Sequence, residues 1–204
     1  MKLYYVPMTS AFRPRWLLEE VGLAHELVRL TLSPKDTKTP EYLRLHPLGQ
    51  VPALVDGDVA MFESAAICMY LAERDPAQTL LPGDDRAQRA GYYQWIFYAM
   101  DTLSPVVHPV YLRWFLASAD QKATVATAAD REAAARVLAP IAAALQDKPF
   151  LLGQRLSTAD VVLGGVLQWA EAAGLLAQNA AQSSVVHAYH ERLRARPAYQ
   201  RAQQ

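Results

Sequence analysis

The sequence predicts an α+β protein in which a sheet-containing N-terminal part, residues 1–75, precedes an all-helical part, residues 86–204. Three observations lead to this prediction. Short β-rich runs alternate with helical runs before residue 75, no strand-like run follows residue 86, and alanine is abundant in that second part. The stretch between them, residues 76–85, contains two prolines and a glycine and is expected to be a linker.

The first elements are expected to be two parallel strands joined by a helix. Leu3–Val6 is a β-rich run that Pro7 ends, and Leu27–Leu32 alternates in the way a strand does. Between them, Trp16–Val21 is a helical run, and Gly22 suits a helix C-cap. A strand–helix–strand unit of this kind forms a right-handed parallel connection.

The remainder of the N-terminal part is expected to add a helical turn, a hairpin and a helix. Asp56-Gly57-Asp58 is a hairpin signal, and Thr39-Pro40 is typical of a helix start. The expected elements are a turn over Tyr42–Leu45, strands Val51–Val55 and Val59–Phe62, and a helix from Ser64 towards Arg74. The resulting order, βαβαββα, is a thioredoxin-like arrangement.

In the second part we expect long helices interrupted by prolines. The first covers Arg86 to about Ala117, bent or broken at Pro105 and Pro109. A helix from about Asp120 to Leu145 follows, with a kink at Pro140. Ser157-Thr158-Ala159-Asp160 predicts a capping box for a third helix that ends near Gly174. The last two cover about Ser184–Arg196 and Ala198–Arg201.

Charge and composition exclude several functions. Lys and Arg total 20 and Asp and Glu total 20, so the net charge of +0 argues against a nucleic-acid binder. The sequence has no block of basic residues, which argues against electrostatic binding to a membrane surface. The chain shows no apolar run typical of a signal peptide or a membrane span. A single cysteine and no Cys/His cluster predict neither disulfide nor metal. We therefore expect a cytoplasmic protein.

Val51-Pro52 stands where the third strand begins. One interpretation is a trans proline, which strand starts tolerate because the missing amide hydrogen is not needed there. The other is a cis peptide bond, which would turn the backbone of Val51 away from the sheet and towards an extended peptide on its edge. The residues alone leave both interpretations open.

Glu63-Ser64 lies where the last strand meets its helix. Backbone amides at a helix N-terminus, with a hydroxyl beside them, bind a carboxylate, and Glu63 would accept from an ammonium group. Together they would match an α-amino-acid head group. The alternative is purely structural, with Ser64 as the N-cap and Glu63 as an acid of the first turn.

Thr9-Ser10 follows the first strand and precedes the first helix. A hydroxyl there would stabilise a thiolate. Lowering a thiol pKa from about 8.5 to about 6.5 needs roughly 2.7 kcal/mol. A hydrogen bond to a charged acceptor contributes about 1.5–3 kcal/mol, and a helix N-terminus about 0.3–1 kcal/mol. These two effects suffice without a metal, although helix capping alone would also explain the residues.

Taken together, these motifs resemble the glutathione transferase family over almost the whole chain. The segments that carry the resemblance are Lys2–Tyr5 with Trp16–Glu20 and Gly22, His46–Leu54 with Asp56-Gly57, Glu63–Ile67 with Tyr70-Leu71, and Ser157–Asp160. The resemblance implies a cytosolic homodimer whose N-terminal domain holds glutathione. Its helical domain would shape the pocket of a second, hydrophobic substrate. Glutathione would serve as co-substrate, and no other cofactor is implied.

The resemblance also implies roles for individual residues. The thiolate would be stabilised by Ser10, which we favour, or by Thr9, as in the serine- or cysteine-type branch. Val51 beside cis-Pro52 would pair with the cysteinyl part of glutathione. Glu63 and Ser64 would hold the γ-glutamyl end.

Two positions depart from the family pattern, and the role of a third stays open. Gln50 stands where many relatives carry Lys, which leaves Lys35, Lys38 or His46 as candidate partners of the glycyl carboxylate. Ala11 stands where many bacterial relatives carry Ser. Arg13 would either orient the active-site turn or be a surface charge.

Other residues have competing interpretations. Cys68 is expected to be a packed apolar residue. The aromatic residues between Tyr92 and Phe115 recur at near-helical spacing and are either core or the lining of the substrate pocket, for which we choose Tyr98 and Tyr111. His108 would reach that pocket or face solvent. Asp101 is a weak candidate for contact with the glutathione of a partner subunit.

The predicted activity is conjugation of the glutathione thiolate to small hydrophobic electrophiles, a detoxification reaction. One alternative is a glutathione-dependent cis–trans isomerase, because the turn Met8–Arg13 partly matches that branch but lacks its cysteine. The other is a non-catalytic protein that binds glutathione or hydrophobic compounds. Disulfide reduction is less expected, since no cysteine stands at this turn.

Overall fold

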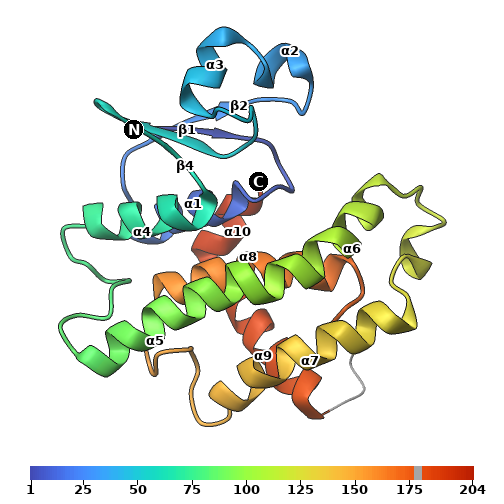
Figure 1. The fold of residues 1–204 in the computed structure, drawn as a ribbon. Helices are drawn as coiled ribbons and strands as arrows, with labels where there is room; N and C mark the ends of the chain where they lie inside the picture. Colours follow the sequence, from blue (N-terminus) through green and yellow to red (C-terminus); the bar gives the residue numbers. More distant parts are fainter. Residues whose placement is uncertain (177–180) are drawn as a thin grey trace. The chain divides into compact units, whose positions relative to one another are not determined.

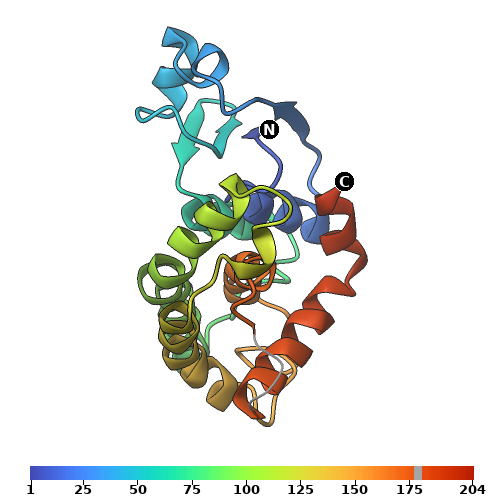
Figure 2. The same ribbon diagram turned by 90° about the vertical axis from the view of Figure 1, so that its right-hand side faces the viewer.

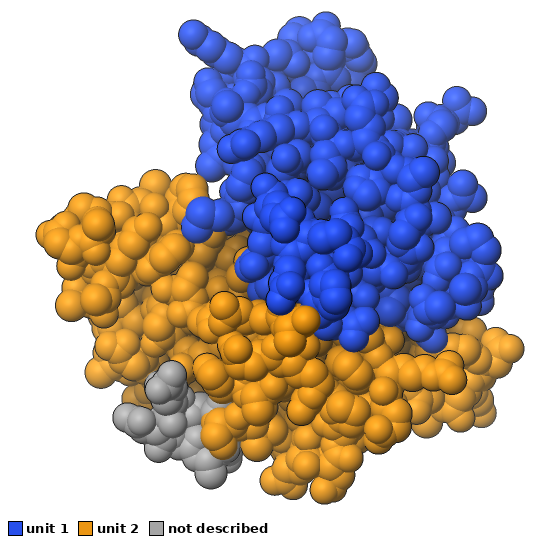
Figure 3. Space-filling view, turned by 180° about the vertical axis from the view of Figure 1, so that it is seen from behind, with its two compact units in different colours: residues 1–81, 196–204 blue, residues 82–195 orange. Residues whose placement is uncertain are grey.

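A computed structural model describes residues 1–176 and 181–204 of the chain. These residues form two compact units, coloured separately in Figure 3. The first unit comprises Met1–Leu81 and also Arg196–Gln204, and the second comprises Pro82–Ala195. The C-terminal segment thus belongs with the sheet-containing unit, whereas the sequence prediction grouped it with the helices.

The strands described in the first unit form one mixed sheet in the order β2-β1-β3-β4. β1 (Lys2–Tyr5) pairs in parallel with β2 (Glu26–Arg29) and antiparallel with β3 (Ala53–Asp56). β3 and β4 (Val59–Phe62) form the predicted hairpin, with Asp56 opposite Val59. The α+β fold and the order of the elements are confirmed, although β2 ends at Arg29 and β3 begins one residue after Pro52.

Helices cover both faces of this sheet (Figures 1 and 2). α1 (Phe12–Val21) and α4 (Ser64–Arg74) lie on one face, and α3 (Pro40–Leu45) lies on the other. As predicted, Thr39 caps α3 through its side chain and Gly22 closes α1 in the left-handed conformation. The short helix α2 (Pro34–Thr37) was not predicted; Ser33 caps it, and Pro34 at its first position favours it.

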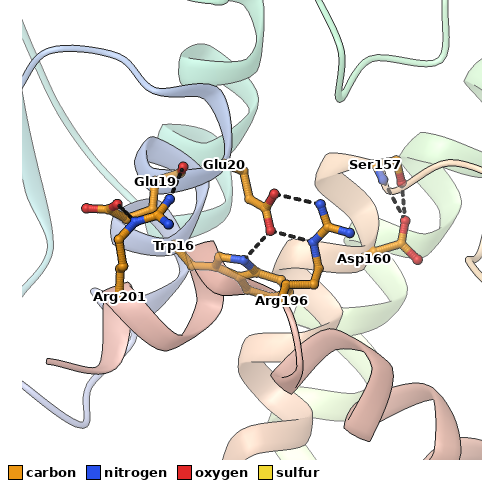
Figure 4. A network of polar contacts seen from close by, with 7 residues as sticks. All are labelled: Trp16, Glu19, Glu20, Ser157, Asp160, Arg196 and Arg201. Carbon is orange, nitrogen blue, oxygen red and sulfur yellow. Dashed lines mark hydrogen bonds and ion pairs between the residues drawn. The ribbon is translucent and has the colours of Figure 1, made fainter.

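The C-terminal helix α10 (Pro197–Gln203) packs on α1. Tyr199 is fully buried, and its ring meets the rings of Phe12 and Trp16 edge-on, with centroids 4.8 and 4.9 Å away. Arg196 binds the carboxylate of Glu20 through two hydrogen bonds (Figure 4). This arrangement fixes the helix that follows the Thr9-Ser10 turn.

The second unit is helical. Its elements are α5 (Arg86–Phe97), a π-helical segment over Tyr98–Leu103, α6 (Ser104–Leu116), a 3-10 turn over Lys122–Thr124, α7 (Ala128–Ala144), α8 (Thr158–Ala172) and α9 (Ala181–Arg194). The capping box at α8 is confirmed: Ser157 and Asp160 bond reciprocally (Figure 4). Asp160 is buried and also accepts from the amide of Leu151 and the hydroxyl of Tyr189.

Two helices in this unit differ from the prediction in detail. The first was expected to be bent or broken at Pro105 and Pro109, and it is not broken: the backbone widens into the π-helical segment just before Pro105, and α6 continues through Pro109. A proline ring clashes with the carbonyl four residues earlier, and a π turn ahead of it moves that carbonyl aside. The second helix begins at Ala128 rather than near Asp120, because Thr127 and Asp130 form a capping box that stops it extending further.

No helix among the described residues is long and apolar enough to cross a membrane.

Candidate functional site

The first strand ends at a turn that brings the hydroxyl of Ser10 to the backbone before Pro52. The Val51-Pro52 peptide bond is cis, and Ser10 Oγ donates to the Val51 carbonyl oxygen at 3.1 Å. Ser10 is half-buried, so its hydroxyl lies at the edge of the protein surface next to the Val51 backbone. The cis interpretation of Val51-Pro52 is therefore confirmed.

Thr9 takes a different part in the same turn. Its Oγ1 donates to the Val6 carbonyl at 2.7 Å and accepts from the Ala11 amide at 3.3 Å. Both bonds are local, so they hold the shape of the turn. Thr9 and Ser10 precede α1, which begins at Phe12, and neither is its N-cap.

Tyr42, which sequence reasoning did not select, fixes the backbone just before Val51. Its phenol donates to the Gln50 carbonyl at 2.6 Å, and its ring packs 5.6 Å from that of Tyr4. Burial raises the pKa of Tyr42 to about 12, so the phenol stays protonated and remains a donor. The side chain of Gln50 is exposed.

Arg13 is buried, with 1% of its surface exposed, and its Nη1 donates to Ser64 Oγ at 2.8 Å. The surface-charge interpretation of Arg13 is therefore wrong. Burial lowers its pKa to about 10, opposed by interactions with Cys68 and Glu63, so the guanidinium remains charged at neutral pH. Burial also raises the pKa of the Cys68 thiol, which lies in the core as expected.

Ser64 is the first residue of α4, and Glu63 occupies the N-cap position without a capping side-chain bond. The interpretation of Ser64 as the N-cap is thus wrong: its hydroxyl accepts from Arg13 inside the protein. Glu63 is exposed and has φ 74° and ψ 107°, a conformation that costs a non-glycine residue free energy. Its carboxylate is held at the surface beside a helix N-terminus.

The three candidate cations for a carboxylate lie in different environments. Lys38 is exposed, and its Nζ donates to the Leu48 carbonyl, close to Gly49 and Gln50. His46 is buried against the ring of Phe62, and burial lowers its pKa, so its imidazole is not a cation at neutral pH. Lys35 is exposed on α2. The structure therefore argues against His46 as an ionic partner.

Gly49 is a second residue that sequence reasoning did not single out. Its φ is +55°, and a Cβ at this position would stand 2.2 Å from the Thr37 carbonyl oxygen. Only glycine lets the Leu48–Gln50 backbone approach α2 this closely. In the sequence, this requirement for glycine is visible only as Gly49 within the segment Pro47–Pro52.

The candidate residues of the helical unit make different kinds of contact. Tyr98 donates to the Val137 carbonyl at 2.8 Å, which fastens the π-helical segment to α7. Tyr111 is buried and stacks on Trp169 with ring centroids 5.1 Å apart, and burial raises its pKa to about 12. His108 is exposed, 5.2 Å from Trp169. Asp101 is exposed.

These features define a class of protein in which a thioredoxin-like unit with a cis-proline edge precedes a helical unit. Models of known protein families support this classification. The glutathione S-transferase N-terminal domain matches residues 1–73, and the glutathione S-transferase C-terminal domain matches residues 124–192. The chain belongs to the glutathione S-transferase family.

Individual relatives extend over nearly the whole chain. Glutathione S-transferase 3 of Zea mays is 32% identical, covering 98% of this chain and 92% of the relative. The disulfide-bond oxidoreductase YfcG of Escherichia coli K12 is 29% identical over 96% of this chain and 91% of its own length. Among solved structures, a glutathione S-transferase from Xylella fastidiosa is 30% identical with a TM-score of 0.78, covering 98% and 96% of the two chains.

Proposed function

We propose that this glutathione S-transferase conjugates the thiolate of glutathione to small hydrophobic electrophiles, with Ser10 stabilising the thiolate. One observation carries this proposal: Ser10 Oγ lies 3.1 Å from the Val51 carbonyl beside cis-Pro52. A cysteinyl residue paired with the Val51 backbone would place its sulfur near this hydroxyl. Thr9 is the weaker candidate because its hydroxyl already donates to Val6 within the turn.

When glutathione binds, the free energies favour transfer of the Ser10 hydrogen bond from the Val51 carbonyl to the thiolate. Ser10 donates to a neutral carbonyl in the free protein, a bond of about 0.5–1.5 kcal/mol, whereas a bond to a charged acceptor contributes about 1.5–3 kcal/mol. Rotation of the side chain towards the thiolate is therefore favourable. Adding about 0.3–1 kcal/mol from the N-terminus of α1, one hydroxyl suffices to lower the thiol pKa by about one to two units.

The two ends of glutathione are assigned to the surroundings of this turn. Glu63 would accept from the γ-glutamyl ammonium group, and the Ser64 amide and hydroxyl would bind its carboxylate, with Arg13 orienting that hydroxyl. For the glycyl carboxylate we propose Lys38, because its ammonium is exposed next to the Gly49–Gln50 backbone. The side-chain amide of Gln50 would donate a further, uncharged hydrogen bond to the same carboxylate.

For the electrophile we propose the aromatic group around Tyr111 and Trp169, with His108 at its exposed side. Tyr98 is less suited because its hydroxyl is already bonded to Val137. A cytoplasmic location, a homodimer and a role in detoxification form part of the same proposal and follow from the family resemblance. Sedimentation of the purified chain tests the dimer.

The decisive test is an ultraviolet titration of the thiolate in the protein–glutathione complex. In Ser10→Ala the pKa of the bound thiol should rise by about one unit relative to the parent protein, because the variant loses the hydroxyl but keeps the N-terminus of α1. Thr9→Ala is the matched control and should leave that pKa unchanged. An unchanged thiol pKa in Ser10→Ala, with glutathione still bound, would disprove the role of Ser10.

A second candidate function is reduction of small disulfides by glutathione, suggested by the resemblance to YfcG. The one cysteine of this chain, Cys68, is buried and its pKa is raised, so both thiols would have to come from glutathione. Two glutathione molecules would reduce one disulfide to two thiols and leave as glutathione disulfide. Parallel assays with an aryl halide and with a mixed disulfide separate the two activities. Neither the isomerase nor the non-catalytic alternative has comparable support.

A further inference from the structure

Two helices of the second unit bring three potential metal ligands together. His187 and Glu191 lie four residues apart on α9 and therefore share one face of that helix, and Glu171 lies on α8. One ligand atom from each of the three side chains lies within 4.8 Å of the other two. Among the described residues, these make up the one such group of three or more His, Cys, Asp or Glu side chains.

A cation already bridges the two carboxylates of this group. Arg194 Nη1 donates to Glu171 and to Glu191, at 2.8 Å in each case. The Arg194 side chain is 41% exposed, so it lies partly in solvent while it bridges the two carboxylates. The carboxylates of Glu171 and Glu191 thus share one cation, with the His187 imidazole close by. The His190 imidazole also lies 3.8 Å from Glu171.

We propose that Glu171, His187 and Glu191 form a binding site for a first-row divalent transition-metal ion, with Arg194 competing with the ion for both carboxylates. Imidazole and carboxylate ligands suit Zn²⁺ and its neighbours, whereas Mg²⁺ and Ca²⁺ prefer sites made of oxygen alone. Ligand atoms about 2.0–2.2 Å from a tetrahedral zinc ion lie about 3.5 Å apart. The three ligand atoms, which lie within 4.8 Å of one another, would have to move closer together to bind an ion in this way.

The consequence of binding is a link between α8 and α9. Because the ligands come from two helices, an ion bound only by the folded chain stabilises this unit, and above the Kd the gain grows with the logarithm of the free ion concentration. The site is half exposed, and water would complete the coordination shell. This inference does not depend on the glutathione site, which lies in the first unit.

The test is calorimetric titration of the tag-free, full-length protein with zinc chloride. The expected result is one ion per chain, with binding at least about tenfold weaker in His187→Ala. Arg194→Met should bind about three- to tenfold more tightly, because it removes the competing cation while keeping the apolar stem. His25→Ala, in the first unit, is the matched control and should bind as the parent does. Excess magnesium chloride should not displace zinc.

The absorption spectrum of bound Co²⁺ gives a second measurement that does not depend on affinity alone, since its ligand-field bands should change in His187→Ala. Circular dichroism establishes that each variant is folded. The proposal is overturned if several ions bind with no dependence on His187, or if His25→Ala weakens binding as much as His187→Ala does. Weaker binding by folded Arg194→Met would likewise overturn it.

Discussion

Arg13 donates a hydrogen bond of 2.8 Å to Ser64, fifty-one residues later in the chain, within the interior of the first unit. A buried guanidinium is costly: a pKa lowered from 12.5 to about 10 corresponds to about 3 kcal/mol against the charged form. The bond to Ser64 offsets about 1–3 kcal/mol of this cost. We infer that Arg13 holds the Ser64 hydroxyl in the orientation that the proposed glutathione site requires.

The first prediction concerns Arg13→Met. Loss of the bond to Ser64 should lower the free energy of unfolding by about 1–3 kcal/mol, and removal of the buried charge should offset part of that loss. The KM for glutathione should rise about five- to tenfold because the Ser64 hydroxyl is no longer oriented. Urea unfolding and initial rates measure the two effects. Arg15→Met, on the same helix, is the control and should leave the KM unchanged; an unchanged KM in Arg13→Met contradicts the positioning role.

The second prediction compares two substitutions of Glu63. Glu63→Gln and Glu63→Gly both remove the carboxylate, and both should raise the KM for glutathione. They differ in backbone freedom: φ 74° costs a non-glycine residue about 1–3 kcal/mol, whereas glycine costs about 0.5–1 kcal/mol in entropy. Glu63→Gly should therefore be more stable than Glu63→Gln by about 1 kcal/mol in thermal unfolding. The reverse order would show that the conformation is not strained.

The third prediction concerns Gly49→Ala. The added methyl group would stand 2.2 Å from the Thr37 carbonyl oxygen, and its left-handed conformation alone costs about 1–2 kcal/mol. We expect a loss of about 3 kcal/mol in urea unfolding. Gly57 is the matched control, since it has φ +59° but a Cβ added there would meet no atom within 4 Å. Gly57→Ala should lose only about 1–2 kcal/mol; equal losses in the two variants would contradict the collision.

Features that depend on a few neighbouring residues were predicted from the sequence. The C-cap at Gly22, the hairpin around Gly57 and the capping box at Ser157 each combine a turn or cap residue with an adjacent periodic run. Their hydrogen bonds close within about four residues, so the local sequence contains all the partners. The candidate positions Ser10 and Val51 were proposed from a hydroxyl before a helix and from a Val-Pro step at a strand start, and the family resemblance then suggested their roles.

Features that depend on tertiary contacts were not predicted. The partner of Ser64 is Arg13. Beyond its own cap, Asp160 accepts from the Leu151 amide and from the hydroxyl of Tyr189, twenty-nine residues away. Burial changes the charge of His46, which the sequence alone allows as a possible cation. Each of these depends on which side chains the fold brings together, and residue spacing carries no such signal.

The fourth prediction concerns alkaline pH and Tyr42. Its pKa is raised from 10 to about 12 in the folded protein, so between these values the unfolded chain loses a proton that the folded chain keeps. The unfolded state then binds fewer protons, and stability falls as pH rises, by about 1 kcal/mol per pH unit from this residue. Tyr42→Phe should flatten that fall in urea unfolding above pH 10. At neutral pH it should cost about 1 kcal/mol by removing the bond to Gln50. If stability falls with pH equally steeply in Tyr42→Phe and in the parent protein, the pKa of Tyr42 is not raised by folding.

The last prediction concerns the bond between α10 and α1. Glu20 accepts two bonds from Arg196, of 2.6 and 2.8 Å, and one from Trp16 Nε1 at 2.8 Å, and its side chain is only 8% exposed. Arg196→Met leaves this carboxylate buried without its cation, which should cost about 2–3 kcal/mol.

The fluorescence of the parent protein and of each variant during urea unfolding measures this cost, because Trp16 touches both Glu20 and the ring of Tyr199. Arg201→Met is the control: its pair with Glu19 is more exposed and should contribute less than about 1 kcal/mol. In the double variant Arg196→Met/Glu20→Gln, the neutral amide needs no cation, so part of the lost stability should return. Equal losses in Arg196→Met and Arg201→Met would mean that burial of Glu20 does not strengthen its pair.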